Sequence, residues 1–562
     1  MPNPVAVNDL SPISGSLQTS RISYGVETAG KDYGQDYNGT TWYSDIPNNG
    51  QFYTIISNNY TANYYVSRSN AGGAYVEGGL PAVDEYSAPV FWVTVGTSSL
   101  DIITIVNGLP DRIGQVPFNS GSQALNWVAS SSNYFAVGPD YYEQIDADNL
   151  GLYIHGNQII SYPTTGSTWY DISGQNNRFN LINGPAYNAN GWINFDGTND
   201  YAVAVNTTLP SNATSSFTLM AVARTSGGGA YQTVLGTGGL LSQIGFVSNN
   251  AFMYGRNGGG GGLLYVNGGT IATGRFYHLT MTYNGSTATA YLNGVATQTG
   301  VNIGSNGGTN GVHVLSTYTP SAASEILTGD IAEAYVYTQA ISAADVAQNY
   351  YGGPIVTSSL LAAYDAGNLV SYPKSGTTLW NLSNIGTNNA VLTNGVSYNN
   401  IYGGTFNFDG ADDFINLSGD VINYTNVTVE GWVFREDTTD LVNIVSGAGV
   451  VQYFGVYSQT LAYYSSIDTG GWTLGTTTLQ PQTWYHVAIT YDNSNYAVKM
   501  YLNGNLESTS TANASNRTGY IATIGVYADQ AQRFWKGYIS NLRVYNTALT
   551  QAQVLQNYNA TK

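Results

Sequence analysis

Two stretches of the chain repeat one pattern of apolar and polar positions, and each predicts a β-hairpin. The stretch 484–504 reads WYHVAITYDNSNYAVKMYLNG. In its first half apolar residues alternate with more polar ones: Tyr485, Val487, Ile489 and Tyr491 against His486, Ala488 and Thr490. Because successive side chains of a strand point to opposite faces, we expect one buried face and one wetter face. The polar run 492–495 and the pair Asn503-Gly504 supply the turns.

The same pattern occurs earlier in the chain and indicates a duplicated domain. Residues 276–294 read FYHLTMTYNGSTATAYLNG, and the letters YLNG at 291–294 return 210 positions later at 501–504. Three further pairs keep nearly this spacing: 161–163 with 371–373, 195–201 with 408–414, and 329–337 with 537–545. A match of this length and period predicts two copies of one domain, not a short solenoid repeat.

Each copy ends in the signal for a short helix. Asp345 follows Ser342 by three residues, and Gln553 follows Thr550 at the same spacing. Such pairs form a capping box, in which the first side chain bonds the helix backbone and the second bonds back. Apolar residues also occupy the hydrophobic-staple positions: Ile341 with Val346, and Leu549 with Val554.

Segmentation and composition predict an all-β protein of three domains. We expect an N-terminal β domain at 1–145, a first copy at 146–352 and a second copy at 355–562, with Gly352-Gly353-Pro354 as the linker. Within the N-terminal part, strands are expected at 52–56, 63–66, 90–95 and 101–106, and a short helix at 122–129. Only 9% of residues are charged, whereas the chain has 67 Gly and 47 Tyr, which favours short strands between turns.

The repeated motifs carry a family resemblance. FDGxxD(Y/F), WYHVAITYD, YLNG and GYISNLRVYNTALTQAQV resemble the laminin-G-like, concanavalin A-like jelly-roll family, and the resemblance spans both copies. It implies a sandwich of two antiparallel sheets in each copy, and glycan or protein binding that is calcium-dependent in some relatives; the fold alone fixes no function. The opening SYPxxGxTWYDIS at 161–173 is similar to structural proteins of tailed phages.

Charge and segment composition exclude several classes of partner. The formal net charge of −18 argues against a nucleic-acid partner and against an anionic membrane surface. No apolar run is long enough for a transmembrane helix, and the first residues lack the features of a secretory signal peptide. Cys is absent, which excludes disulfides and thiolate metal sites. Such a composition fits a protein made inside a cell and used outside it.

No catalytic constellation is visible, so we expect a protein without enzymatic activity. Glycosidases usually use two carboxylates that flank the scissile bond, and neither copy has a paired-acid motif on one strand. Glu333 is matched by Asn541 in the second copy and is therefore not a repeated acid. His278 and His486 are equivalent, but one histidine per domain makes no ligand cluster, and a structural role is expected.

Acidic turns and aromatic side chains are the candidate binding devices. Asp196 and Asp200 in FDGTNDY, and Asp409, Asp412 and Asp413 in FDGADDF, offer carboxylates of the kind that calcium prefers. The relatives imply a ligand near this strand start, so Asp196, Asp200, Asp409 and Asp413 are the calcium candidates; the alternative is that Asp-Gly only forms the turn. Sugars stack on Trp and Tyr faces, and many of the Tyr residues are expected outside the cores.

These expectations lead to one functional hypothesis and two alternatives. The leading hypothesis is a virion structural protein of a phage, such as a fibre, an appendage or a capsid decoration, that contacts host-surface glycans. Residues 1–145 would then bind other virion proteins, and the resemblance to fibres implies a homo-oligomer such as a trimer. A bacterial cell-surface or extracellular adhesin or lectin is the first alternative, and a polysaccharide-degrading enzyme is the second.

Overall fold

The computed structural model describes residues 145–561 apart from short gaps, and only the backbone of eight strands before them. The longest gaps are 206–214, 303–311, 418–424 and 512–519. The early strands form three antiparallel sheets, β1-β2, β3-β4-β5 and β6-β7-β8. Their bounds are β1 (Gly34–Gln35), β2 (Thr41–Trp42), β3 (Phe52–Ile55), β4 (Tyr64–Arg68), β5 (Tyr75–Gly79), β6 (Val90–Val95), β7 (Ser99–Val106) and β8 (Leu109–Pro117). The four predicted strands are confirmed, and the predicted helix at 122–129 lies outside the described residues.

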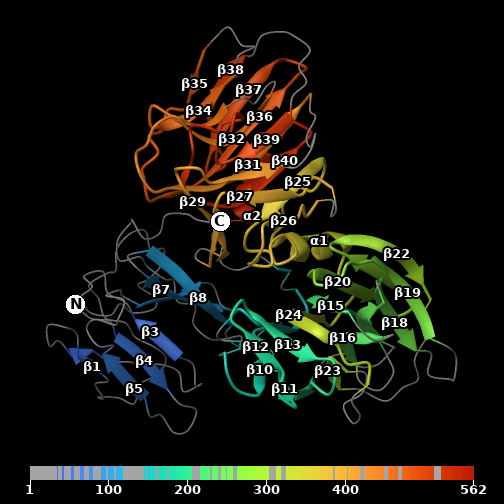
Figure 1. The fold of residues 1–562 in the computed structure, drawn as a ribbon. Helices are drawn as coiled ribbons and strands as arrows, with labels where there is room; N and C mark the ends of the chain where they lie inside the picture. Colours follow the sequence, from blue (N-terminus) through green and yellow to red (C-terminus); the bar gives the residue numbers. More distant parts are fainter. Residues whose placement is uncertain are drawn as a thin grey trace.

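The first copy folds as two antiparallel sheets of eight strands each (Figure 1). One has the order β10-β11-β14-β23-β16-β17-β18-β19, and the other has β12-β13-β24-β15-β20-β21-β22 with β9 paired to β24. The bounds are β9 (Leu150–His155), β10 (Thr168–Tyr170), β11 (Arg178–Ile182), β12 (Ala186–Asn188), β13 (Trp192–Asp196), β14 (Tyr201–Val205), β15 (Phe217–Thr225), β16 (Gln232–Thr237), β17 (Ser242–Val247), β18 (Asn250–Arg256), β19 (Leu263–Thr270), β20 (Tyr277–Tyr283), β21 (Ala288–Leu292), β22 (Val295–Val301), β23 (His313–Leu315) and β24 (Thr328–Tyr337).

The second copy repeats this topology strand for strand. Its sheets are β26-β27-β30-β39-β32-β33-β34-β35 and β28-β29-β40-β31-β36-β37-β38, with β25 paired to β40. The bounds are β25 (Leu360–Asp365), β26 (Thr378–Leu379), β27 (Ala390–Thr393), β28 (Ser397–Asn399), β29 (Thr405–Asp409), β30 (Phe414–Leu417), β31 (Val427–Arg435), β32 (Val442–Ala448), β33 (Tyr453–Tyr457), β34 (Thr460–Tyr464), β35 (Thr473–Leu474), β36 (Trp484–Asp492), β37 (Ala497–Leu502), β38 (Asn505–Thr511), β39 (Tyr520–Ile524) and β40 (Lys536–Tyr545). The predicted all-β class with two jelly-roll sandwiches is confirmed.

The two predicted hairpins are confirmed and occupy equivalent places. β36 pairs with β37 and β20 pairs with β21, each within one sheet. The glycine of each YLNG turn has a φ of 77° and lies against the helix that ends its own domain. A Cβ on Gly504 would lie 2.7 Å from Leu555 Cδ1, and one on Gly294 would lie 2.8 Å from Tyr350 Cδ1. Glycine therefore serves both the left-handed turn and the close approach of the helix.

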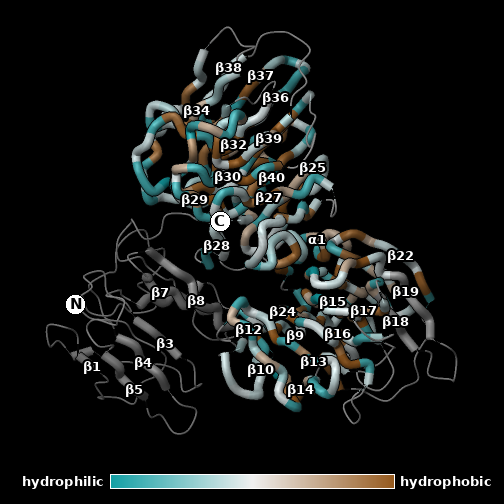
Figure 2. The backbone as a smooth tube through the Cα atoms, viewed as in Figure 1, coloured by the Kyte–Doolittle hydropathy of each residue, from teal (hydrophilic) through white to brown (hydrophobic). Residues whose placement is uncertain are grey.

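One expectation about these hairpins is wrong, because both faces of the strand are buried. Tyr485, Val487, Ile489 and Tyr491 enter the sandwich core as predicted. The opposite face, expected to be wetter, is buried as well, and His486 is 0% exposed. Trp432 and Tyr558 cover it, with ring centroids 5.5 Å and 5.7 Å from the His486 ring. Hydropathy varies from residue to residue along both sandwiches (Figure 2), so hydropathy alone does not show that this face of the sheet is covered.

One short helix packs on the outer face of this sheet in each jelly roll: α1 (Ala343–Tyr351) in the first and α2 (Gln551–Ala560) in the second. Both predicted capping boxes are present, at Ser342 and Thr550. An asparagine on each helix fixes it to the sheet: Asn349 Nδ2 donates to Tyr337 Oη at 2.7 Å, and Asn557 Nδ2 donates to Tyr545 Oη at 2.9 Å. Within the described part of the chain, neither helix has the length and apolar character needed to cross a membrane.

A buried cluster joins the two jelly rolls, and α1 lies at this junction (Figure 1). The Tyr350 hydroxyl donates to the Leu382 carbonyl at 2.9 Å, and the Tyr350 carbonyl accepts from Asn368 Nδ2 at 2.9 Å. The guanidinium carbon of Arg275, in the first jelly roll, lies 3.8 Å from the ring centre of Trp380 in the second. The apolar members of the cluster are Trp192, Val222, Phe276, Ala332 and Tyr350 on one side and Ala363, Leu369, Val370 and Leu382 on the other.

Candidate functional site

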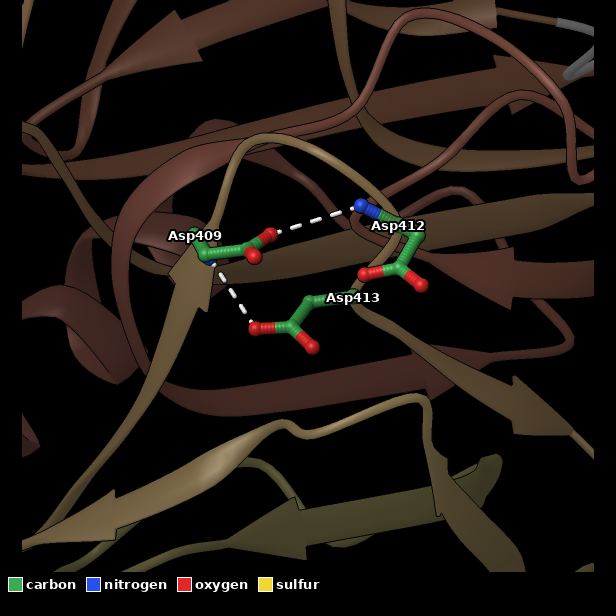
Figure 3. Close-up of side chains that lie close together, drawn as sticks. All are labelled: Asp409, Asp412 and Asp413. Atoms are coloured by element: carbon green, nitrogen blue, oxygen red, sulfur yellow. Dashed lines mark hydrogen bonds between the residues drawn. The ribbon is translucent and has the colours of Figure 1, made fainter.

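The acidic turn of the second jelly roll brings three carboxylates together between β29 and β30 (Figure 3). Ligand oxygens of Asp409, Asp412 and Asp413 lie within 4.8 Å of one another. Asp409 Oδ1 accepts from the backbone N–H groups of Ala411 at 2.7 Å and Asp412 at 3.3 Å. Asp413 Oδ2 accepts from the Asp409 N–H at 3.0 Å, and burial raises the pKa of the Asp413 carboxyl. Two of the three carboxylates therefore already stabilise the turn by local hydrogen bonds.

The first jelly roll has the same turn with one carboxylate fewer, because Asn199 stands where Asp412 stands in the second. Asp196 Oδ1 accepts from the N–H groups of Thr198 at 2.7 Å and Asn199 at 3.2 Å, and these bonds, led by that of Thr198, lower the pKa of Asp196. Asp200 Oδ2 accepts from the Asp196 N–H at 3.3 Å. The structure thus confirms the turn chemistry of all four calcium candidates, and calcium binding stays a prediction.

A variant of Asp412 can distinguish calcium binding from turn formation alone, because the Asp412 carboxylate makes no hydrogen bond within the turn. If the cluster binds calcium, calcium raises the melting temperature, and Asp412→Asn removes that shift without changing the melting temperature in chelator. At free calcium ten times the Kd, the gain in free energy of unfolding is roughly 1.4 kcal/mol. Thermal unfolding with calcium or chelator measures this, and Asn199→Asp in the first jelly roll is the converse variant. A wild-type protein that calcium does not stabilise would leave the acidic residues as turn residues only.

Three of the four histidines, His278, His313 and His486, are buried, which fits a structural role. Burial lowers the pKa values of His278 and His486 to about 3, and that of His313 to about 4, so these rings are neutral at pH 7. His155 Nε2 lies 3.4 Å from Glu333 Oε1, and Glu333 also accepts from the Tyr335 hydroxyl. Glu333 is 4% exposed and thus part of a buried polar group beneath the sheet surface.

A group of aromatic side chains on the outer face of the second jelly roll is a further candidate binding site. The aromatic cluster, as we name it, consists of Tyr453, Tyr457, Tyr464 and Trp472. The ring centroid of Trp472 lies 4.7 Å from that of Tyr453, 4.7 Å from that of Tyr457 and 5.1 Å from that of Tyr464. Tyr453 is fully buried beneath the others, which are half-buried. The cluster therefore presents partly exposed ring faces on a packed base.

Strand alternation explains why these rings point outward. Phe454 and Val456 of β33 enter the sandwich core, so Tyr453 and Tyr457 face the opposite side. Tyr464 of β34 pairs directly with Tyr453, and Trp472 immediately precedes β35. The Tyr453 hydroxyl donates to the Val456 carbonyl at 2.6 Å, and burial raises its pKa, so the phenol stays neutral.

The side chains of Asp440 and Arg435, which we name the latch, hold the turn of the hairpin that carries Tyr457. The turn residues Ser458 and Gln459 have φ angles of 52° and 62°, as a type I′ turn requires. Asp440 accepts from both of their N–H groups, at 3.0 Å and 3.3 Å. Arg435, 3% exposed, donates to Gln459 Oε1 at 3.3 Å. Non-glycine residues in the left-handed region are strained and persist only where surrounding contacts hold them. These hydrogen bonds therefore stabilise the turn and fix the hairpin in place.

The aromatic cluster was missed at the level of individual residues. The sequence predicted exposed Tyr and Trp faces as binding devices but not which ones, since Trp472 follows an irregular stretch with no period. In the first jelly roll, Gln243 and Val247 occupy the places of Tyr453 and Tyr457 in the sheet. A comparison of the two copies could therefore have pointed to these residues, because the second copy has rings where the first has an amide and an aliphatic side chain.

Comparisons with known proteins give a family match and more distant structural similarities. A family model described as the concanavalin A-like lectin/glucanases superfamily matches residues 196–347 and 409–555. No curated protein sequence matches the chain. Among solved structures, domain 4 of the extracellular GH43 arabinanase AbnA from Geobacillus stearothermophilus, in complex with arabinotriose, is 22% identical, with a TM-score of 0.27 over 35% of this chain and 98% of that one.

Two binding domains of toxins are also similar over a longer part of the chain. The botulinum neurotoxin serotype D binding domain is 13% identical, with a TM-score of 0.32 over 70% of this chain and 98% of that one. The binding domain of Paraclostridial Mosquitocidal Protein 1 is 12% identical, with a TM-score of 0.31 over the same shares, 70% and 98%. The family model covers more than half of the chain and falls in both jelly rolls, so the protein belongs to the concanavalin A-like lectin/glucanases superfamily.

Proposed function

We propose that this protein binds glycans without enzymatic activity, and that the aromatic cluster of its second jelly roll holds the ligand. The observation that supports the proposal is the contact of Trp472 with three tyrosine rings on an outer sheet face. The apolar face of a sugar ring packs well on such a surface, and its hydroxyl groups stay in water. Membership of a superfamily that includes lectins agrees with this function.

Replacing Trp472 by alanine is expected to weaken glycan binding by about 30-fold, because a buried aromatic contact of this kind contributes about 2 kcal/mol. Binding is measured on a glycan array and then by calorimetry with the best oligosaccharide. Tyr170→Ala is the matched control, since Tyr170 is an exposed aromatic residue, 46% accessible, in the first jelly roll. Equal binding by wild type and Trp472→Ala would place any glycan site elsewhere. The release of new reducing ends from polysaccharides would contradict the non-enzymatic assignment.

We further propose that the protein is a phage virion component, a fibre, an appendage or a capsid decoration, that contacts host-surface glycans as a homo-oligomer. One jelly roll binds a glycan weakly, and an oligomer raises the avidity. Residues 1–145 differ from the two copies, and we assign them to attachment to other virion proteins. The alternative location is the surface of a bacterial cell.

A chain limited to residues 146–562 is expected to bind glycan like the full chain and to be absent from particles. The physical reason is that both jelly-roll cores lie within this range. Mass spectrometry of purified particles from complemented infections measures incorporation. Normal incorporation would assign attachment to a jelly roll, and detection of the full chain on bacterial cells without particles would favour the adhesin.

A further inference from the structure

We infer that the second jelly roll selects acidic glycans, and that Arg533 binds the sugar carboxylate beside the aromatic cluster. The inference rests on the proposed function and adds the chemical class of the ligand. Arg533 lies three residues before the start of β40, and its guanidinium carbon is 4.6 Å from the ring centre of Tyr527 and 5.7 Å from that of Tyr453. Since Tyr453 also contacts Trp472, the cation continues the row of rings.

The donors of Arg533 are unused within the part of the chain that the structure describes. Its Nε is buried without a hydrogen-bond partner, and no carboxylate lies within ion-pairing distance of the guanidinium. Arg435 behaves differently, because its guanidinium donates to Gln459 Oε1, the Leu479 carbonyl and the Thr439 carbonyl. Arg435 thus has a structural role in the latch, whereas two ring faces hold Arg533 and leave its donors for a ligand.

The first jelly roll shows that the backbone at this place does not require an arginine. Glu325 occupies the equivalent position, with a φ of 56° against 62° for Arg533. The carbonyl of each accepts from the strand opposite, from Thr233 N at 2.8 Å and from Asn443 N at 3.0 Å. The two copies therefore share a backbone conformation and differ in the sign of the side-chain charge.

The charges around Tyr453 include the guanidinium of Arg533, which lies over its ring, and the carboxylate of Asp440. Asp440, the acidic group that acts on Tyr453, already accepts two backbone N–H groups of the hairpin turn. The chain as a whole carries a net charge of −18, so long-range attraction does not explain a preference for anions. A planar guanidinium beside stacked rings matches a sugar that offers an apolar ring face and a carboxylate, such as a uronic acid.

Paired oligosaccharides test this inference directly. The probes are an oligogalacturonate and the same oligosaccharide after reduction of its carboxylates to alcohols, and calorimetry measures both at two salt concentrations. We expect the acidic form to bind at least tenfold more tightly and to weaken with salt. Arg533→Gln lowers the affinity for the acidic form to that for the reduced form, and Arg533→Lys keeps part of the preference. Glu325→Gln is the matched control and alters neither affinity.

The outcomes separate this inference from the proposed function. If Trp472→Ala weakens both probes but Arg533→Gln keeps the preference for the acid, the glycan site stands and the role of Arg533 is overturned. Equal affinity of wild type for the two probes also overturns it. If neither probe binds and a glycan array with further acidic and carboxyl-reduced pairs shows no binding, both proposals fail. Melting temperatures confirm that each variant is folded.

Discussion

Replacing Arg543 by methionine is expected to lower the free energy of unfolding of the second jelly roll by about 3–5 kcal/mol at pH 8, because it leaves a buried carboxylate without its cation. Arg543 Nη1 lies 3.7 Å from Glu430 Oε1, and their side chains are 3% and 0% exposed. Asn557 Nδ2 also donates to Glu430 Oε1 at 2.7 Å, so the same carboxylate binds α2 to the sheet. Chemical denaturation followed by tryptophan fluorescence measures the loss.

The first jelly roll supplies the matched control. Met220 and Tyr335 face each other at the places of Glu430 and Arg543. The double variant Glu430→Met/Arg543→Tyr transfers this pair, and we expect it to be as stable as wild type or more stable, since uncharged residues incur no desolvation penalty. A single Arg543→Met variant that is no less stable than the double variant would show that the ion pair contributes nothing to the fold.

The same pair predicts how stability depends on pH. Burial raises the pKa of Glu430 from 4.5 to about 7, and the charge of Arg543 opposes that rise. A carboxyl group with a raised pKa in the folded state binds more protons folded than unfolded, so its contribution to stability falls as pH rises from about 4.5 to about 7. Without Arg543 the pKa is higher still, and the fall continues above pH 7. Glu430→Met removes this slope.

The sequence was sufficient for local structure, because local structure depends on neighbours in the chain. Alternation predicted the hairpins, and the spacing of Thr550 and Gln553 predicted a capping box that the structure contains. The burial of His486 was not predictable in this way. Its cover consists of Trp432 and Tyr558, which are distant in sequence, and a helix packed on a sheet hides a face that alternation predicts to be wet.

The residues of the candidate sites were also only partly predictable from the sequence. The acidic turns are contiguous in sequence, so their residues and their turn chemistry were predictable from a few letters. The aromatic cluster joins residues from β33, β34 and the stretch before β35, and Arg533 reaches it from the segment before β40. Only the order of strands in the sheet brings these segments together, and no periodic pattern encodes that order.

Replacing Tyr350 by alanine is expected to separate the unfolding of the two jelly rolls and to lower the free energy of unfolding by about 3–5 kcal/mol. Tyr350 is 1% exposed and lies in the cluster that both jelly rolls share. Its hydroxyl bonds to Leu382 and its carbonyl to Asn368, both in the second jelly roll. Differential scanning calorimetry is expected to show one coupled transition for wild type and two for the variant.

Tyr558 provides the matched control, because it holds the position of Tyr350 on α2 and packs on Trp432 and His486 within its own jelly roll. Tyr558→Ala is expected to destabilise the second jelly roll, but the two jelly rolls are still expected to unfold in one coupled transition. Tyr350→Phe keeps the ring and removes only the bond to the Leu382 carbonyl, with an expected loss of about 1–3 kcal/mol. If Tyr350→Ala still unfolds in one step, the stack of Arg275 on Trp380 carries the coupling instead. In either case the buried cluster at this junction links the two jelly rolls.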